Sequence, residues 1–144
     1  MLGAEQDIIA EYVQSGQVKY VFVPILDHAD RSVQAHQAAE CAAEQGQFWP
    51  LHDIFFEELG DLARGEIRQV IKEKAQRLPL DHERFNACVD EQRYVELVQA
   101  QDEQRRAIGV RTRPTIAVND QVVVGPQPFS VFKELIDPLV GGQN

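Results

Sequence analysis

The sequence predicts a single α/β domain, and three observations point to this class. Residues 18–26 form a near-continuous run of apolar, β-branched and aromatic side chains, typical of a strand covered on both faces. From residue 30 to about residue 106, apolar residues recur at helical spacing. After Gly109 the pattern alternates with a period of two, as in a half-buried strand. With a first helix ahead of residue 18, the expected order is helix, strand, several helices, hairpin and helix.

The first helix is expected over residues 5–14. Its apolar side chains recur at helical spacing: Ile8, Ile9, Tyr12 and Val13. Gly16 follows, and glycine is the usual residue just past a helix end. In the expected strand over residues 18–26, Pro24 lies near the end, where its missing amide hydrogen does least harm.

The region that follows is expected to be entirely helical. Five helices are predicted, over residues 30–45, 48–59 and 66–77, around Phe85 and Cys88, and over residues 94–108. Asp30 or Ser32 can cap the first of them, and Asp81 the fourth. The last helix carries Asp102, Glu103, Arg105 and Arg106, which we interpret as a solvated helix face with weak local ion pairs.

Two short strands and a helix complete the chain. Residues 115–118 and 121–124 alternate as strands, and Asn119-Asp120 between them is a two-residue hairpin signal because both side chains tolerate left-handed backbone angles. Pro128 then opens a final helix.

Length and composition exclude several classes of protein. The chain has 144 residues, 44% of them apolar and 26% charged, which suits one packed domain and not a disordered one. Its net charge of −9 disfavours nucleic acid as a partner. No apolar run approaches the roughly 18 residues of a membrane span, so none is expected. The sequence begins without an export signal, so as written it is expected in the cytoplasm.

Motifs along nearly the whole chain resemble the DsbA-like thiol–disulfide oxidoreductases, a family with a thioredoxin fold and a helical insertion. The motifs are Glu11-Tyr12-Val13, Gly16-Gln17-Val18, Ala38-Ala39-Glu40-Cys41-Ala42, Glu44-Gln45-Gly46-Gln47-Phe48-Trp49, Leu51-His52-Asp53, Phe85-Asn86-Ala87-Cys88, Gly109-Val110, Pro114-Thr115, Val118-Asn119 and Gly125-Pro126. The resemblance implies one thioredoxin-like domain over residues 1–144, with the insertion at about residues 31–108. Family members usually work outside the cytoplasm, so the compartment stays open.

The resemblance also implies a redox motif that this sequence does not contain. The family places Cys-x-x-Cys at the start of the first helix, after a central first strand, and this chain begins part-way along that helix. Its two cysteines are Cys41 and Cys88. We therefore expect no catalytic residue here, and a non-catalytic member that binds an extended peptide or protein, or dimerises. The alternative is a truncated portion of a thiol–disulfide oxidoreductase whose first strand and redox motif lie upstream, so whether the chain is an enzyme stays open.

Without the family's first strand, the expected strands 18–26 and 115–118 would each bury unpaired backbone groups. Each such group costs about 1–3 kcal/mol. Three solutions are considered: the two strands pair with each other, a second chain fills the gap in a homodimer, or the natural product is longer than this sequence.

By resemblance, Pro114 matches the family's cis-proline and, with Arg113, borders the groove for extended peptides. Two residues depart from the family pattern: Thr112 stands where glycine is usual, and Arg113 stands where a small residue is usual. A large cation at position 113 would suit an acidic ligand or a carboxylate within the fold. The alternative is an ordinary solvated arginine.

Cys41 and Cys88 match a cysteine pair that some family members carry, which implies a structural disulfide. The alternative is two buried, reduced thiols. His52 and Asp53 are adjacent on a helix and are not expected to face each other, so we assign them to packing and hydrogen bonding. His28, His36 and His82 show no metal-ligand spacing, and neither a metal nor another cofactor is expected.

Overall fold

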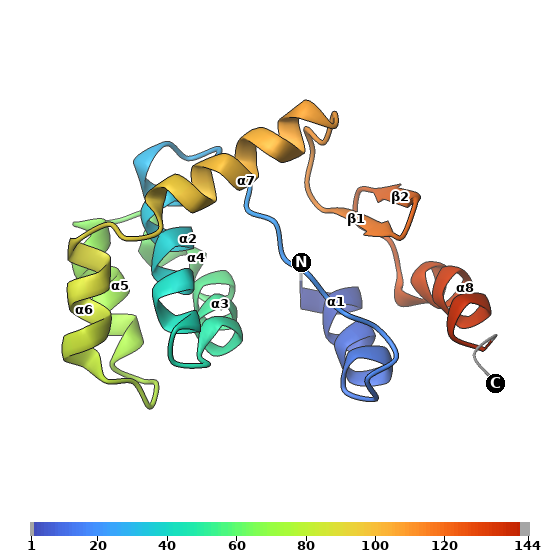
Figure 1. The fold of residues 1–144 in the computed structure, drawn as a ribbon, viewed down its shortest axis with the longest axis horizontal. Helices are drawn as coiled ribbons and strands as arrows, with labels where there is room; N and C mark the ends of the chain where they lie inside the picture. The colour runs from blue at the N-terminus through green and yellow to red at the C-terminus, as the bar shows by residue number, and fades with distance from the viewer. Residues whose placement is uncertain (1, 142–144) are drawn as a thin grey trace. The chain divides into compact units, whose positions relative to one another are not determined.

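The computed structural model describes residues 2–141, and the chain divides into two compact units (Figure 1). We name residues 1–22 together with 109–144 the sheet unit, and residues 23–108 the helical unit. Each unit has its own cluster of buried apolar side chains. The helical insertion expected over residues 31–108 lies within the helical unit.

The described residues of the sheet unit form three helical segments and one hairpin. These are α1 (Leu2–Ile8), the π-helix η1 (Ile9–Val13), β1 (Thr115–Val118), β2 (Gln121–Val124) and α8 (Phe129–Val140). β1 and β2 pair antiparallel, with Thr115 opposite Val124 and Val118 opposite Gln121. Asn119 adopts a φ of 51° in the two-residue turn, as its side chain permits. The hairpin lies where the sequence predicts it.

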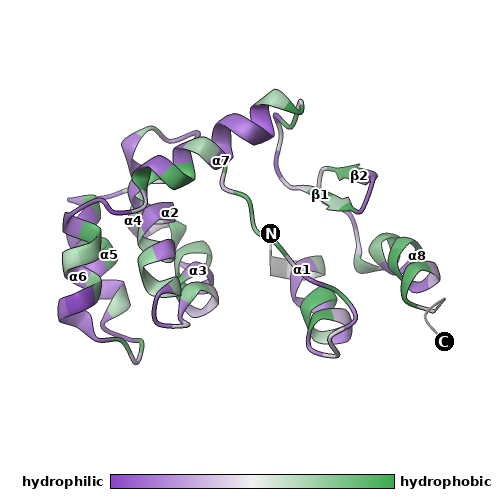
Figure 2. Cartoon of the chain, viewed as in Figure 1, coloured by the Kyte–Doolittle hydropathy of each residue, from purple (hydrophilic) through white to green (hydrophobic). Residues whose placement is uncertain are grey.

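The core of the sheet unit lies between η1, α1 and α8. Ile8, Tyr12, Phe132 and Ile136 are buried there, and the ribbon of α8 is coloured green at its apolar residues in Figure 2. The hydroxyl of Tyr12 donates a hydrogen bond to Asp137 Oδ1 at 2.5 Å, which ties η1 to α8. This core is the surface on which the hairpin packs.

The first helix differs from the single α-helix expected over residues 5–14. It begins at Leu2, and at Ile9 it widens into η1, where the amide of Gln14 donates to the carbonyl oxygen of Ile9 at 2.9 Å. Apolar spacing over one turn does not distinguish a π-helix from an α-helix. Gly16, with a φ of 76°, follows the helix end as expected.

The predicted strand over residues 18–26 is not present, and so the first of the three alternatives, pairing of this strand with residues 115–118, is wrong. The only sheet in the described part of the chain is the pair β1–β2. β-branched and aromatic residues favour extended backbone, but a strand also needs a ladder with a neighbour. Val18 and Tyr20 instead lie in a segment without regular secondary structure and pack against the core of the sheet unit.

The helical unit contains six helices: the five that the sequence predicts, in the same order, and one additional short helix, α4, which follows the expected helix 48–59. They are α2 (Asp30–Ala43), α3 (Phe48–Glu57), α4 (Leu59–Leu62), α5 (Ile67–Ala75), α6 (His82–Asp90) and α7 (Val95–Ala107). Asp81 caps α6 as predicted, because its carboxylate accepts from the amide of Arg84 at 3.0 Å. Within residues 2–141, no helix has both the length and the apolar character needed to cross a membrane.

The solvated face expected on α7 is wrong for Asp102 and Arg105, which are only 5% and 6% exposed. The Asp102 carboxylate accepts hydrogen bonds from the amide of Leu26 at 2.9 Å and from Arg106 Nε at 2.7 Å, and it pairs with Arg105. Burial alone would raise the pKa of Asp102, but these hydrogen bonds hold it below its usual value. The carboxylate of Asp102 on α7 thus holds the segment that precedes α2 through the amide of Leu26.

Candidate functional site

The residues expected to border a peptide groove, Arg113 and Pro114, lie in the loop that leads into β1. The peptide bond between them is cis. Thr115 Oγ1 donates to the carbonyl oxygen of Thr112 at 2.7 Å, and the amide of Gly125 donates to the carbonyl oxygen of Pro114 at 2.8 Å. These two hydrogen bonds hold the loop against the start of the hairpin.

One edge of β1 is open. In an antiparallel ladder, residues that exchange hydrogen bonds with the partner strand alternate with residues whose N–H and C=O point away from it. The bond between Gly125 and Pro114 fixes the phase of this alternation. Thr115 and Ala117 are therefore the residues of β1 whose backbone groups point away from β2. Neither makes a backbone hydrogen bond on that side to any residue that the structure describes.

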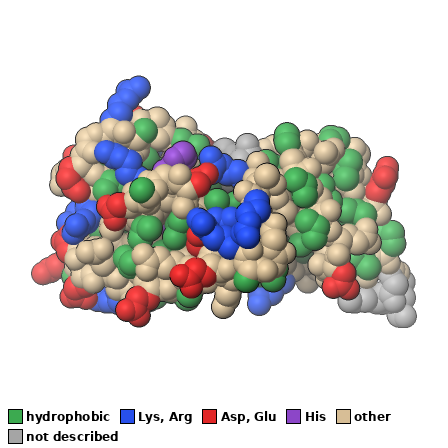
Figure 3. All heavy atoms as spheres, turned by 90° about the horizontal axis from the view of Figure 1, so that it is seen from above, with side chains coloured by type: hydrophobic (Ala, Val, Ile, Leu, Met, Phe, Trp, Pro, Cys, Tyr) green, Lys and Arg blue, Asp and Glu red, His purple; other side chains and the backbone are tan. Residues whose placement is uncertain are grey.

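The two faces of the hairpin differ. Ile116, Val118 and Val123 pack on the core of the sheet unit. Val122 and Val124 point to the opposite face and are 58% and 57% exposed. On the face of the sheet unit drawn in Figure 3, hydrophobic side chains gather and charged ones are few. β1 therefore combines an open backbone edge with an apolar layer beneath it.

Two arginines come just before β1 in the sequence. Arg111, Thr112 and Arg113 are all exposed. Arg111 forms no ion pair with any residue between positions 2 and 141. The hydrogen bond from Thr115 to the Thr112 carbonyl fixes the backbone between the two arginines.

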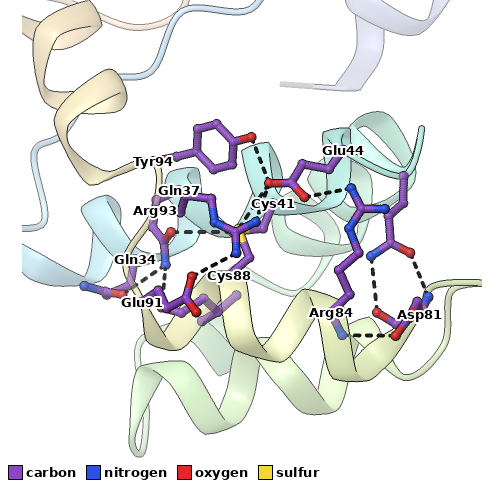
Figure 4. Close-up of a disulfide and its surroundings, with 12 residues drawn as sticks. Gln34, Gln37, Cys41, Glu44, Asp81, Arg84, Cys88, Glu91, Arg93 and Tyr94 are labelled. Atoms are coloured by element: carbon purple, nitrogen blue, oxygen red, sulfur yellow. Dashed lines mark hydrogen bonds and ion pairs between the residues drawn. A yellow bond between two sulfur atoms is a disulfide. The ribbon is translucent and has the colours of Figure 1, made fainter.

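The expected cysteine pair is present as a disulfide in the helical unit (Figure 4). Cys41 on α2 and Cys88 on α6 are bonded, with their Cα atoms 5.9 Å apart, and each residue is 1% exposed. No other cysteine exists in the sequence. Because both sulfurs are bonded and buried, neither is a nucleophile in this state.

Glu44, one helical turn after Cys41, accepts hydrogen bonds from several polar side chains near the disulfide. Its carboxylate accepts from Arg93, Arg84 and Tyr94, each at 2.9 Å, as the dashed lines in Figure 4 show. The hydrogen bond from Arg93, followed by that from Tyr94, holds the pKa of Glu44 below its usual value. This role of Glu44 was not predicted from the sequence, although its spacing of three positions from Cys41 puts it on the same helix face.

The histidines differ in one respect from expectation. His52 Nδ1 lies 3.1 Å from Asp53 Oδ1, so the two side chains do meet, although neighbouring helix positions point apart. His52 is 3% exposed and stacks against Phe48, which agrees with its expected packing role. His36, also on the helical unit, has its pKa lowered to about 4 by burial, with His52 as the second cause. No group of three or more His, Cys, Asp or Glu side chains in the described residues could hold a metal ion.

Comparison with known proteins assigns the family. A family model described as thioredoxin matches residues 3–138. This chain belongs to the thioredoxin family. A solved structure, oxidised BdbD from Bacillus subtilis, superposes with a TM-score of 0.81 over 95% of this chain and 76% of that one, at 23% identity. The thioredoxin-like fold expected from the resemblance is thereby confirmed.

Two curated proteins are similar in sequence to most of this chain. The thioredoxin-like chain is 29% identical to Na(+)/H(+) antiporter NhaA 3 of Salinispora tropica, over 85% of its own length and 18% of the antiporter. It is 26% identical to disulfide bond formation protein D of Bacillus subtilis, over 92% of its own length and 62% of that protein. The chain thus spans less than two thirds of the curated relatives that it matches.

Proposed function

We propose that this thioredoxin-like chain binds an extended segment of another protein along the open edge of β1. The observation that carries the proposal is the pair of residues Thr115 and Ala117, whose backbone groups point away from β2 and have no partner among the described residues. Such an edge is a template for an added strand. Binding of this kind draws its affinity from main-chain hydrogen bonds and its specificity from alternate side chains.

The apolar layer under the hairpin supports this mode of binding. An added strand turns every second side chain toward the core side of the sheet. On that side Ile116 and Val118 are partly buried against the core of the sheet unit, and Val18 packs on the same cluster. An occupant with apolar residues at alternate positions would extend this layer.

The chain would act by binding and without thiol chemistry of its own. The disulfide occupies both cysteines and belongs to the helical unit, whereas the open edge belongs to the sheet unit. Pro114 and Arg113 would border the occupant at the start of β1.

The test replaces one outward-facing amide. Ala117→Pro removes an N–H that the hairpin does not use, while Val122→Pro does the same on the outer edge of β2 and serves as the matched control. The probe is a capped peptide of about nine residues with valine at alternate positions. We expect Ala117→Pro to weaken binding at least about tenfold, as loss of a strand-pairing bond and its register would, and Val122→Pro to leave it near the wild-type value. Equal affinity of all three proteins, each checked by circular dichroism, would contradict the proposal.

A second copy of the chain is an alternative occupant. Light scattering over a range of protein concentrations separates the cases. A dimer that is lost in Ala117→Pro and kept in Val122→Pro would assign the open edge of β1 to dimerisation.

A second candidate function is thiol–disulfide exchange by a longer protein of which these residues form a part. The observation that favours it is the match to 62% of disulfide bond formation protein D. Insulin reduction is the assay. We expect no turnover by these 144 residues alone, and turnover once residues encoded upstream supply a Cys-x-x-Cys pair. Turnover by the 144 residues that disappears in a Cys41→Ser, Cys88→Ser variant would instead make the buried pair a redox centre.

A further inference from the structure

We infer that Cys41 and Cys88 form a reversible couple, which a small monothiol such as glutathione opens while the helical unit stays folded. The thiolate of one glutathione attacks a sulfur of the bond, forms a mixed disulfide with it and releases the other cysteine. A second glutathione then displaces the first from the chain. The chain gains two electrons and two protons, and oxidised glutathione leaves. The reverse reaction closes the bond.

The disulfide lies in the middle of a row of polar contacts between α2 and α6 (Figure 4). Five residues in and just after α2 take part, and in chain order they are Gln34, Gln37, Cys41, Glu44 and Gln45. Their partners in the same order are Gln92, the carbonyl oxygen of Val89, Cys88, Arg84 and the backbone of Asp81. The partner numbers fall as the α2 numbers rise, so the two helices run antiparallel and contact each other in register.

The contacts on either side of the disulfide do not use its sulfur atoms. On one side, Gln37 Nε2 donates a hydrogen bond to the carbonyl oxygen of Val89 at 3.2 Å. On the other side, the amide of Asp81 donates to Gln45 Oε1 at 2.7 Å, and Gln45 Nε2 donates to the carbonyl oxygen of Asp81 at 3.2 Å. Because both sides stay tied after reduction, the two thiols remain beside each other.

The folded unit also has an acceptor in place for each thiol proton. Gln37 Oε1 is 3.7 Å from Cys41 Sγ, and Glu44 Oε1 is 3.8 Å from Cys88 Sγ. A thiol is a weak donor, and its hydrogen bonds to oxygen are long. Reduction therefore puts no buried S–H group into a site without an acceptor, and the helical unit can hold the dithiol as well as the disulfide.

Burial limits the exchange to small thiols. Each cysteine is only 1% exposed, so an attacking sulfur reaches the bond only when the helix pair opens locally. A small thiol fits such an opening, whereas the surface of a folded protein does not. The same burial protects the reduced thiols from oxidation beyond the disulfide.

The experiment equilibrates the full chain with mixtures of reduced and oxidised glutathione and measures the fraction of dithiol by intact mass after acid quenching. The value of [GSH]²/[GSSG] at half reduction is the effective concentration of one thiol toward the other. The same titration in urea provides the unfolded reference. We expect the folded chain to have an effective concentration about 100- to 1000-fold higher than the unfolded chain. Reduced and reoxidised samples should both keep a helical circular dichroism spectrum and a cooperative urea transition.

Gln45→Ala tests the contacts that hold the thiols in register, because it removes both hydrogen bonds to Asp81 without touching a sulfur. Gln47→Ala is the matched control, since Gln47 is also partly buried and its side chain makes no hydrogen bond to a described residue. We expect Gln45→Ala to lower the effective concentration by about 2- to 10-fold and Gln47→Ala to leave it unchanged.

Three results would each overturn the inference. The first is loss of the cooperative transition when the wild type is reduced. The second is a disulfide that glutathione does not open at any ratio in the absence of urea. The third is an equal effect of Gln45→Ala and Gln47→Ala on the effective concentration.

Discussion

At the scale of single residues, His36 links the stability of the helical unit to pH. Burial, with a smaller effect from His52, lowers its pKa to about 4 from the ordinary value near 6.5. The folded chain therefore keeps the imidazole neutral at pH values where the unfolded chain protonates it. The stabilisation is complete above about pH 6.5 and is lost as the pH falls toward 4.

We predict that His36→Gln flattens this part of the stability profile. Urea unfolding of wild type and variant at several pH values between 4 and 8 measures the difference. The free energy of unfolding of the wild type should fall by about 1–3 kcal/mol more than that of the variant between pH 7 and pH 4. Parallel profiles for wild type and His36→Gln would contradict the assignment.

Asp102 shows why residue roles were only partly predictable. A charge pattern on a helix indicates which residues can pair locally, and Asp102 does pair with Arg106 one turn away. It does not indicate that another segment covers the helix. The amide of Leu26, 76 positions away in sequence, reaches this carboxylate and buries it. Long-range contacts of this kind leave no local signal.

At the scale of elements, the hairpin was predictable from the sequence, whereas the absence of a strand before α2 was not. β1 and β2 need only each other, and their two-residue turn carries residues that tolerate a positive φ. Residues 18–26 have the composition of a strand, but composition does not supply the neighbour that a ladder requires. The same reason explains the candidate site: the resemblance located Pro114, whereas the open edge of β1 became visible only with the register of the sheet.

We predict that losing the disulfide between α2 and α6 lowers the free energy of unfolding by about 4 kcal/mol. The bond closes a loop of 47 positions, and the chain-entropy estimate for a loop of that length has this size. A Cys41→Ser, Cys88→Ser variant and the reduced wild type, both unfolded in urea, measure it. Reductant should not destabilise the double variant further, which controls for other effects of the reagent.

Intact mass tests the bond itself. Reduction should add the mass of two hydrogen atoms to the wild type and nothing to the double variant. A wild type whose mass and stability are both unchanged by reductant would show that the bond is absent.

At the scale of the whole molecule, the two units differ in charge and in how each is held together. The helical unit carries seventeen acidic and ten basic residues, and the sheet unit six and four. The helical unit has a core built from five of its helices, with Leu51, Ile71 and Phe85 fully buried, and a disulfide inside it.

We predict that residues 23–108 fold without the rest of the chain. Their core and their disulfide are internal, so no buried apolar cluster is cut by this division. The expected result is a helical circular dichroism spectrum and a cooperative urea transition. The matched control is the same fragment with Leu51→Ala, which should be less stable by about 2–5 kcal/mol. An oxidised fragment that lacks a cooperative transition would contradict the prediction.

The bond between Cys41 and Cys88 also limits how far the chain can be extended by a force applied to its two ends. Through the disulfide, the shortest covalent path from one terminus to the other passes directly from α2 to α6. The helices α3, α4 and α5 therefore lie in a closed loop outside that path. A chain pulled from its two ends would reach an extended length about 160 Å shorter than its residue count implies. The helices of that loop would carry no tension until the sulfur–sulfur bond is reduced.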